Sequence, residues 1–126
     1  MEYPVITAWS YSRYGVYEQC PFKAKLLYID KFKEPGSQAM DKGIAIHSEL
    51  ERYLKLPNEP LPQSGIKLCA DLVELKARKP YSELEVCFNK DWLPVDWFAK
   101  DAWVRIKIDA LVKEGDYCLV VDFKTG

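Results

Sequence analysis

Two stretches near the C-terminal end of the sequence alternate apolar and polar residues and are separated by a short turn. Valine, isoleucine and alanine occupy every second position of the stretch 104–112, and the stretch 117–124 alternates in the same way. Between them lies Lys113-Glu114-Gly115-Asp116, a composition typical of a β-turn. The pattern therefore predicts an antiparallel hairpin over about 104–124 with one apolar and one polar face.

The polar face of this hairpin brings two carboxylates together. With Gly115 and Asp116 in the turn, Asp109 lies opposite Asp122, and the same register pairs Lys107 with Lys124 and Ile108 with Phe123. A turn that begins one residue earlier makes the two aspartates diagonal neighbours, still on one face. Two carboxylates ~5 to 7 Å apart repel each other unless positive charge lies between them.

Two explanations account for this pair of carboxylates. In the first, Arg105, Lys107 and Lys124 neutralise them on a solvent-exposed sheet face. In the second, the carboxylates bind a divalent cation, and Lys124, two residues beyond Asp122, points at whatever the cation holds.

The residues before the hairpin predict helices and one further strand. Residues 10–33 are expected to form two short helices that meet near Cys20, with Pro21 in the first turn of the second. Ser37 is expected to cap a helix that runs to about Lys55, and a third helix is expected over about 65–78. The alternation in 81–88 predicts a strand with Leu84, Val86 and Phe88 on one face and Glu83, Glu85 and Cys87 on the other.

Length and composition indicate one α/β domain over residues 1–126, with a helical part (1–80) followed by a sheet (81–126). The net charge of -1 excludes a uniformly cationic surface, although five basic and two acidic residues lie between Arg13 and Lys33. The sequence starts without a signal peptide and contains no long apolar run, so we expect a cytoplasmic protein that does not cross a membrane. The four cysteines are too far apart for a Cys-x-x-Cys pair and are expected to be reduced and mostly buried.

Two polar residues outside the hairpin are candidates for the same site. His47 follows Gly43 by one turn on the apolar stripe of the helix expected after Ser37, and Glu85 lies on the polar face of the expected strand. A histidine on an apolar stripe is more often a core residue than a ligand. Because a single histidine cannot form a polyhistidine zinc site, a metal here would be held mainly by carboxylates, which favours Mg or Mn.

These residues together resemble the PD-(D/E)XK nuclease superfamily, particularly its RecB-like exonuclease branch, which includes CRISPR-associated and phage nucleases. The resemblance covers nearly the whole chain in five elements, and these are Ser10-Tyr11-Ser12-Arg13 with Tyr17-Glu18-Gln19-Cys20-Pro21, Gly43-Ile44-Ala45-Ile46-His47 followed by Glu51, Glu85 with Phe88, Ile108-Asp109, and Asp122-Phe123-Lys124-Thr125-Gly126.

The resemblance implies a restriction-endonuclease-like core, with N-terminal helices packed on a mixed sheet that has the hairpin at its centre. It implies that Mg or Mn is bound by His47, Asp109, Asp122 and the Phe123 carbonyl. It further implies that Glu85 acts as an accessory acid, and that Lys124 orients the attacking water and stabilises charge on the phosphate. The implied activity is hydrolysis of DNA phosphodiester bonds, as an exonuclease in DNA repair, recombination or phage DNA processing.

The sequence departs from the pattern of this family in three places. Ile106 replaces a glycine that relatives often carry three residues before the aspartate of the Ile-Asp motif, here Asp109. Cys20 is the only candidate ligand for the iron–sulfur cluster of some relatives, so we expect no cluster in this chain. The family usually continues beyond Lys-Thr-Gly with a helix and further strands, so we expect the domain to be incomplete after Gly126.

DNA is the expected partner, with a helicase or recombination protein as a further partner implied by the resemblance. The expected DNA contacts are Arg105 and Lys107 beside the site, together with Arg13 and Lys23. Trp92, Trp97 and Phe98 are candidates for stacking on unpaired bases, or for packing at the edge of the core. A nuclease-like module that binds DNA or a partner without cleaving, and an α/β domain with a merely solvated polar face, are the alternatives.

Overall fold

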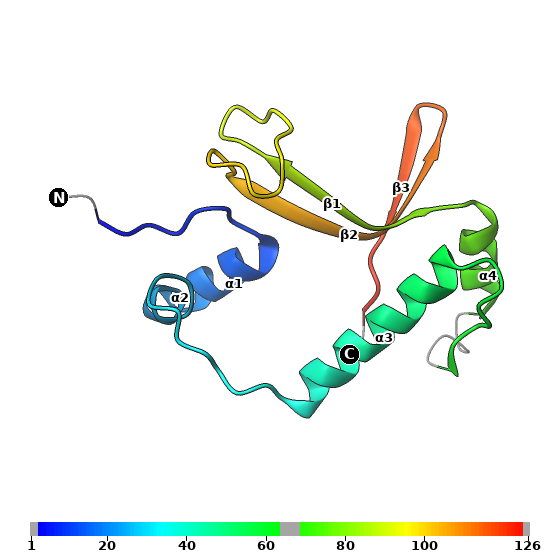
Figure 1. Ribbon diagram of the computed structural model, residues 1–126, viewed down its shortest axis with the longest axis horizontal. Helices are drawn as coiled ribbons and strands as arrows, with labels where there is room; N and C mark the ends of the chain where they lie inside the picture. Colours follow the sequence, from blue (N-terminus) through cyan, green and yellow to red (C-terminus); the bar gives the residue numbers. More distant parts are fainter. Residues whose placement is uncertain (1–2, 64–68, 125–126) are drawn as a thin grey trace. The chain divides into compact units, whose positions relative to one another are not determined.

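The computed structural model describes residues 3–63 and 69–124. Its elements, in chain order, are α1 (Tyr11–Gln19), α2 (Pro21–Ala24), the π-helix η1 (Lys25–Ile29), α3 (Gln38–Lys55), α4 (Cys69–Ala77), β1 (Tyr81–Phe88), β2 (Val104–Glu114) and β3 (Tyr117–Val121) (Figure 1). Helices together with a three-stranded sheet of order β1-β2-β3 agree with the expected α/β class.

The chain forms two compact units. The first unit consists of Met1–Pro35 and Glu85–Lys107, and the second of Gly36–Leu84 and Ile108–Gly126. Strands β1 and β2 each contribute residues to both units. The expectation of a single domain over 1–126 stays a prediction.

Strands β2 and β3 form the hairpin that the alternation predicts. They pair antiparallel, from Glu114 opposite Tyr117 to Ala110 opposite Val121. This register confirms the turn at Gly115 and Asp116 and excludes the turn one residue earlier. Gly115 has a φ of +57°, a left-handed conformation that glycine adopts without steric cost.

The hairpin ends earlier than the expected boundary of about 124. Strand β3 stops at Val121, so the expected pairs of Asp109 with Asp122, of Ile108 with Phe123 and of Lys107 with Lys124 are not part of the ladder. The physical reason is a contact between residues far apart in the sequence, because the backbone N–H of Phe123 donates a hydrogen bond to the Asp109 carboxylate instead of to a strand carbonyl. Thr125 and Gly126 of the last motif lie outside the described residues.

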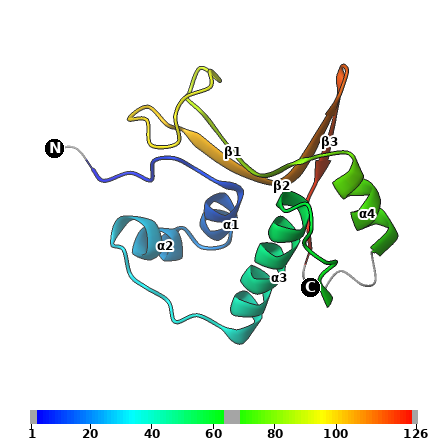
Figure 2. The same ribbon diagram turned by 45° about the vertical axis from the view of Figure 1, so that its right-hand side comes forward.

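In the second unit, α3 and α4 pack against the hairpin (Figures 1 and 2). Their shared core consists of Leu50, Tyr53, Leu54, Leu72, Leu75, Ala110 and Val112. Helix α3 begins where expected, because the Ser37 hydroxyl accepts a hydrogen bond from Met40 N at 3.1 Å. The expected start of α4 lies outside the described residues, and its end at Ala77 falls one residue before the expected Arg78.

In the first unit, two short helices meet at Cys20, as expected. Ser10 caps α1, and α2 begins with Pro21. The sequence pattern does not predict η1, which follows α2 directly. Trp9 forms a parallel β-bridge with Val104 of β2, in which Arg105 N donates a hydrogen bond to Trp9 O at 2.7 Å.

Strand β1 has the expected bounds, but its faces differ from strict alternation. Cys87, expected on the polar face, is buried against Ala8 and Ala102 in the core of the first unit. Glu83 has a φ of +51°, which breaks the regular pleat of the strand. All four cysteines are free, yet only Cys87 is buried, so the expectation of mostly buried thiols is wrong.

Candidate metal centre

Asp109 lies at the centre of a polar cluster in the second unit. Its side chain is 13% exposed. One carboxylate oxygen, Oδ2, accepts a hydrogen bond from Phe123 N at 2.7 Å, and the other, Oδ1, lies 3.3 Å from His47 Nδ1. The position follows from the strand, because Asp109 directly precedes the fully buried Ala110, which anchors this part of β2 in the core.

His47 reaches this cluster from α3. Leu50 and Leu54 lie on the same stripe of the helix and are buried in the core, and this burial sets the direction in which His47 points. The imidazole is 31% exposed and meets the Phe123 ring edge-on, with 6.2 Å between the ring centroids. His47 is therefore a partly exposed group held beside a carboxylate rather than a buried core residue.

Glu83 is the third member of the cluster, and sequence reasoning did not select it. One donor atom from each of His47, Glu83 and Asp109 can be chosen so that all three lie within 4.8 Å of one another. One signal in the sequence could have identified Glu83. It lies two residues before Glu85, and residues two apart in a strand share a face. Its left-handed backbone costs about 1 kcal/mol for a residue with a Cβ, which marks this position as structurally unusual.

The donor atoms of this cluster fit a divalent cation. Two carboxylates and one imidazole offer the oxygen and nitrogen ligands that Mg, Mn and other first-row divalent ions accept. The bond from Phe123 N to Asp109 holds one of the carboxylates in place, as outer hydrogen bonds do for metal ligands. We call His47, Glu83 and Asp109 the metal cluster.

Asp122 and Lys124 lie beside the metal cluster without belonging to it. Lys124 Nζ is 2.5 Å from Asp122 Oδ2, and both side chains are exposed. This hydrogen bond is the main reason that the pKa of the Asp122 carboxyl lies below its ordinary value of 3.8; partial burial opposes the shift. A side-chain hydrogen bond with Asp109 and the positive charges of Lys124 and His47 lower the pKa further.

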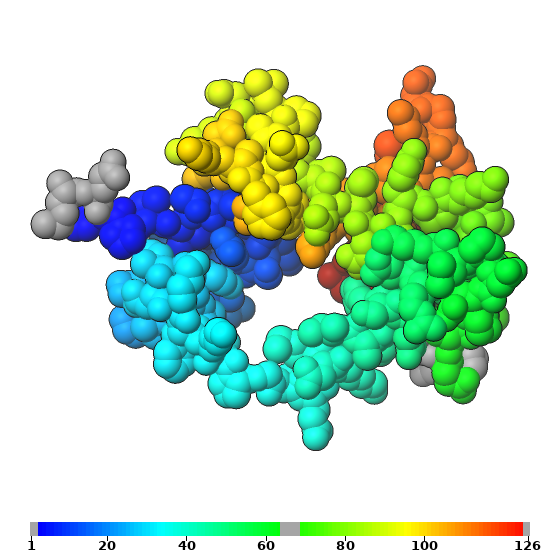
Figure 3. Space-filling model, in the orientation of Figure 1, coloured from blue at the N-terminus to red at the C-terminus, as the bar shows by residue number. Residues whose placement is uncertain are grey.

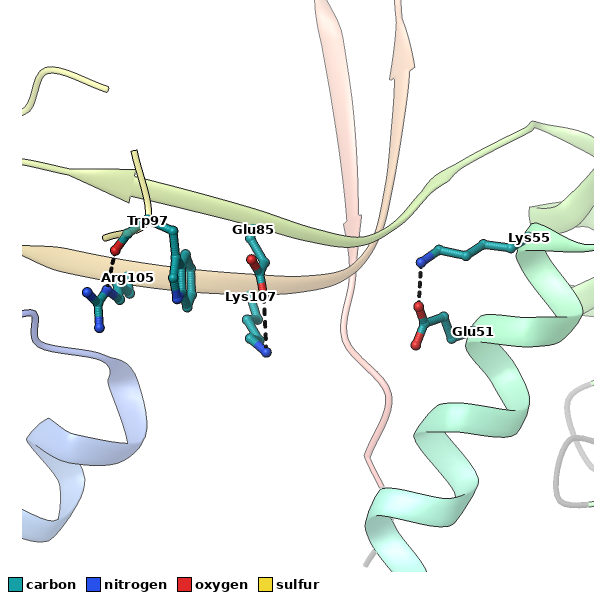
Figure 4. A network of polar contacts seen from close by, with 6 residues as sticks. All are labelled: Glu51, Lys55, Glu85, Trp97, Arg105 and Lys107. Atoms are coloured by element: carbon teal, nitrogen blue, oxygen red, sulfur yellow. Dashed lines mark hydrogen bonds and ion pairs between the residues drawn. The ribbon is translucent and has the colours of Figure 1, made fainter. Parts of the chain in front are cut away.

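Five of the expected site residues lie in the first unit, where each has a partner: Glu85, Lys107, Arg105, Arg13 and Lys23. Glu85 Oε1 lies 3.2 Å from Lys107 Nζ, and Arg105 Nε donates to Trp97 O at 2.7 Å (Figure 4). Arg13 donates to the carbonyls of Thr7 and Ala8, and Lys23 pairs with Glu34 at 3.0 Å. Figure 4 also shows the ion pair of Glu51 and Lys55 on α3 of the second unit.

The arrangement thus brings together some of the expected site residues. His47 and Asp109 meet in the metal cluster, and Asp122 contacts Asp109. Glu85 pairs with a lysine in the first unit, and among the described residues Glu83 is the glutamate of the metal cluster. For Phe123, the structure shows a role of the backbone N–H, and the expected role of its carbonyl stays a prediction.

Comparison with known proteins gives one match. A family model described as the PD-(D/E)XK nuclease superfamily matches residues 8–106, which is more than half of the chain. No curated protein and no solved structure matches the chain. Among the described residues, no helix is long and apolar enough to cross a membrane.

Proposed function

The chain belongs to the PD-(D/E)XK nuclease superfamily, and on that premise we propose that it hydrolyses phosphodiester bonds of DNA with Mg or Mn as cofactor. The observation that carries the proposal is the metal cluster, in which an imidazole and two carboxylates converge from a helix and two strands. A cation needs several donor atoms around one point, and three segments far apart in the sequence supply them here, which favours a metal site over a merely solvated sheet face.

His47, Glu83 and Asp109 would hold the cation, with Asp122 and the Phe123 carbonyl as further ligands. The bound ion would lower the pKa of a water molecule and offset the negative charge that develops on the phosphate. The carboxylate of Asp109 keeps its orientation because Phe123 N donates to it. Asp122 can act as a ligand in its ionised form, and the hydrogen bond from Lys124, which lowers the pKa of this carboxyl, favours that form.

Lys124 would act on the phosphate. Its side chain is 82% exposed and its ammonium lies beside Asp122, so it can approach a ligand held at the metal cluster. There it would orient the attacking water and stabilise negative charge on the phosphate oxygens. We assign Glu85 an accessory role, since it also sets the position of Lys107 through their ion pair.

We further propose that cleavage proceeds from DNA ends, in DNA repair, recombination or phage DNA processing, next to a helicase or recombination protein. This part rests on the resemblance of the motifs to RecB-like exonucleases. Comparing linear and covalently closed circular DNA of the same sequence tests it directly. An exonuclease degrades only the linear form, and cleavage of the closed circle would contradict this part of the proposal.

The test of the activity itself is a nuclease assay with Mg, with Mn and with a chelator. We expect cleavage with either metal and none with the chelator. Asp109→Asn and Lys124→Ala should each lower the rate by a factor of about 100 or more, because each removes a charge that acts in the transition state. Lys113→Ala is the matched control, since Lys113 is an exposed lysine of the same hairpin outside the cluster. Unchanged rates in both site variants would overturn the proposal.

A second candidate function is DNA binding without cleavage. The observation in its favour is that the family match ends at residue 106, before Asp109, Asp122 and Lys124. This candidate predicts DNA binding that does not depend on divalent metal, and no turnover with any divalent ion. The same assay distinguishes the two, because only the nuclease yields shortened products.

A further inference from the structure

An exposed aromatic and cationic surface lies in the loop between β1 and β2 and on the adjoining end of β2. The loop, yellow in Figure 3, is part of the surface of the first unit. Phe98 is 85% exposed, although burying a phenylalanine side chain stabilises a protein by about 1.5 to 3 kcal/mol. A phenyl ring left in water at this position is therefore available to a ligand. We define the stacking surface as Trp97, Phe98, Arg105 and Lys107.

Arg105 holds the stacking surface together. Its Nε donates to Trp97 O at 2.7 Å, and its guanidinium carbon lies 5.4 Å from the centroid of the Trp97 ring and 5.5 Å from that of Phe98. Within the ranges 3–63 and 69–124, the structure gives no hydrogen-bond acceptor to the two terminal nitrogens of this guanidinium. The planar cation is thus oriented by one bond and two rings while its remaining donors can bind an anion.

Lys107 adds a second cation on the other side of the same indole ring. Its Nζ lies 5.8 Å from the Trp97 centroid, and Figure 4 shows Trp97 between Arg105 and Lys107. Trp97 itself packs partly against the core of the first unit, which fixes the ring relative to β2. Glu85 partly neutralises Lys107, so Arg105 supplies most of the free positive charge.

This combination matches the chemistry of one ligand class. Aromatic faces stack on nucleobases, and arginine and lysine bind the phosphates that follow one another along the strand. In a duplex the base faces are already stacked and paired, whereas in a single strand they are accessible. An acidic peptide would use the two cations but would gain nothing from an exposed phenyl ring.

We propose that the stacking surface binds single-stranded DNA, with an unpaired base on Phe98 and a phosphate on Arg105. This inference rests on the proposed nuclease function and names the form of DNA that the protein takes. Arg105 and Lys107 precede Asp109 on the same strand, so the strand that carries the surface also carries a residue of the metal cluster.

The test measures binding without cleavage. A fluorescent thymidine 20-mer and a hairpin duplex are titrated with the full chain in a chelator, and fluorescence anisotropy gives both dissociation constants. Phe98→Ala should weaken binding of the single strand by a factor of about ten, as expected for one lost base stack, and leave duplex binding unchanged. Phe22→Ala is the matched control, because Phe22 is also an exposed phenylalanine of the first unit.

Three outcomes would overturn the inference. In the first, the unmodified chain does not bind the single strand. In the second, Phe98→Ala weakens the binding of single strand and duplex equally. In the third, polyglutamate competes with the labelled strand as effectively as unlabelled thymidine 20-mer does. Because the chelator prevents metal-dependent cleavage, failure here is separate from failure of the nuclease proposal. If the chain cleaves DNA with metal but Phe98→Ala binds the single strand as tightly as the unmodified chain does, only this inference is refuted.

Discussion

The backbone N–H of Phe123 donates a hydrogen bond to Asp109 Oδ2, with 2.7 Å between nitrogen and oxygen. This bond ends the β2–β3 ladder at Val121 and at the same time orients a carboxylate of the metal cluster. One contact thus carries both a structural and a functional role. The two roles can be separated by substitution.

Asp109→Ala should lower the free energy of unfolding by about 1 to 3 kcal/mol, because the partly buried Phe123 N–H loses a charged acceptor. Asp109→Asn keeps an oxygen at the same position and should lose less stability. Both variants should fail to bind metal tightly. Urea denaturation of the metal-free chain measures the first effect, and equal stabilities of the alanine and asparagine variants would show that the hydrogen bond contributes nothing.

Glu83 and Glu85 form a matched pair for locating the metal. We expect Mn to raise the melting temperature of the unmodified chain, because a ligand that binds only the folded state stabilises it. Glu83→Gln should abolish most of this rise, since Glu83 donor atoms lie with those of His47 and Asp109. Glu85→Gln should leave it largely intact, because Glu85 pairs with Lys107 instead. The opposite pattern would assign the metal to the glutamate that the sequence motif indicates.

Much of the hairpin could be predicted from the sequence, because its determinants are local. The Gly115-Asp116 turn sets the register, and alternation sets the faces. The end of the ladder could not be predicted, since it depends on where the Asp109 carboxylate lies in three dimensions. The same limit applies to η1, whose five residues show no pattern that separates a π-helix from an α-helix.

The site was predictable in part for a similar reason. His47 and Asp109 could be selected because a helical stripe and a strand face point them inward. Alternation along the strand could not decide between Glu83 and Glu85, because it puts both on one face. The left-handed backbone at Glu83 breaks that regularity, and nothing in the sequence around it predicts a positive φ.

Lys124→Ala should separate activity from stability. Its ion pair with Asp122 is exposed, and such pairs contribute about 0 to 1 kcal/mol to folding. Cleavage should nevertheless fall by a factor of about 100 or more, because the ammonium acts on the phosphate. A loss of activity that only parallels a loss of folded protein would contradict this role. Circular dichroism and the nuclease assay measure the two effects.

The same substitution should raise the pKa of Asp122. In the unmodified chain, the hydrogen bond from Lys124 is the main cause that keeps this pKa below 3.8. A lowered pKa in the folded state stabilises the protein above the unfolded-state pKa, and this contribution is lost as the pH falls through the folded-state value. Lys124→Ala should therefore reduce the contribution. A carboxyl-detected NMR titration that gives the same pKa in both proteins would contradict the pairing.

Gly115→Ala tests the turn that sets the register of the hairpin. Gly115 has a φ of +57°, and a Cβ built there meets nothing within 4 Å, so the cost of the substitution is conformational rather than steric. We expect the free energy of unfolding to fall by about 1 kcal/mol. Gly115→Asn should lose less, because asparagine tolerates the left-handed region.

Gly15→Ala is the matched control, since Gly15 lies in α1 with equally open space, and alanine favours a helix. It should raise stability, so urea denaturation should shift in opposite directions for the same chemical change at the two glycines. A Gly115→Ala protein as stable as the unmodified chain would contradict this conformational cost.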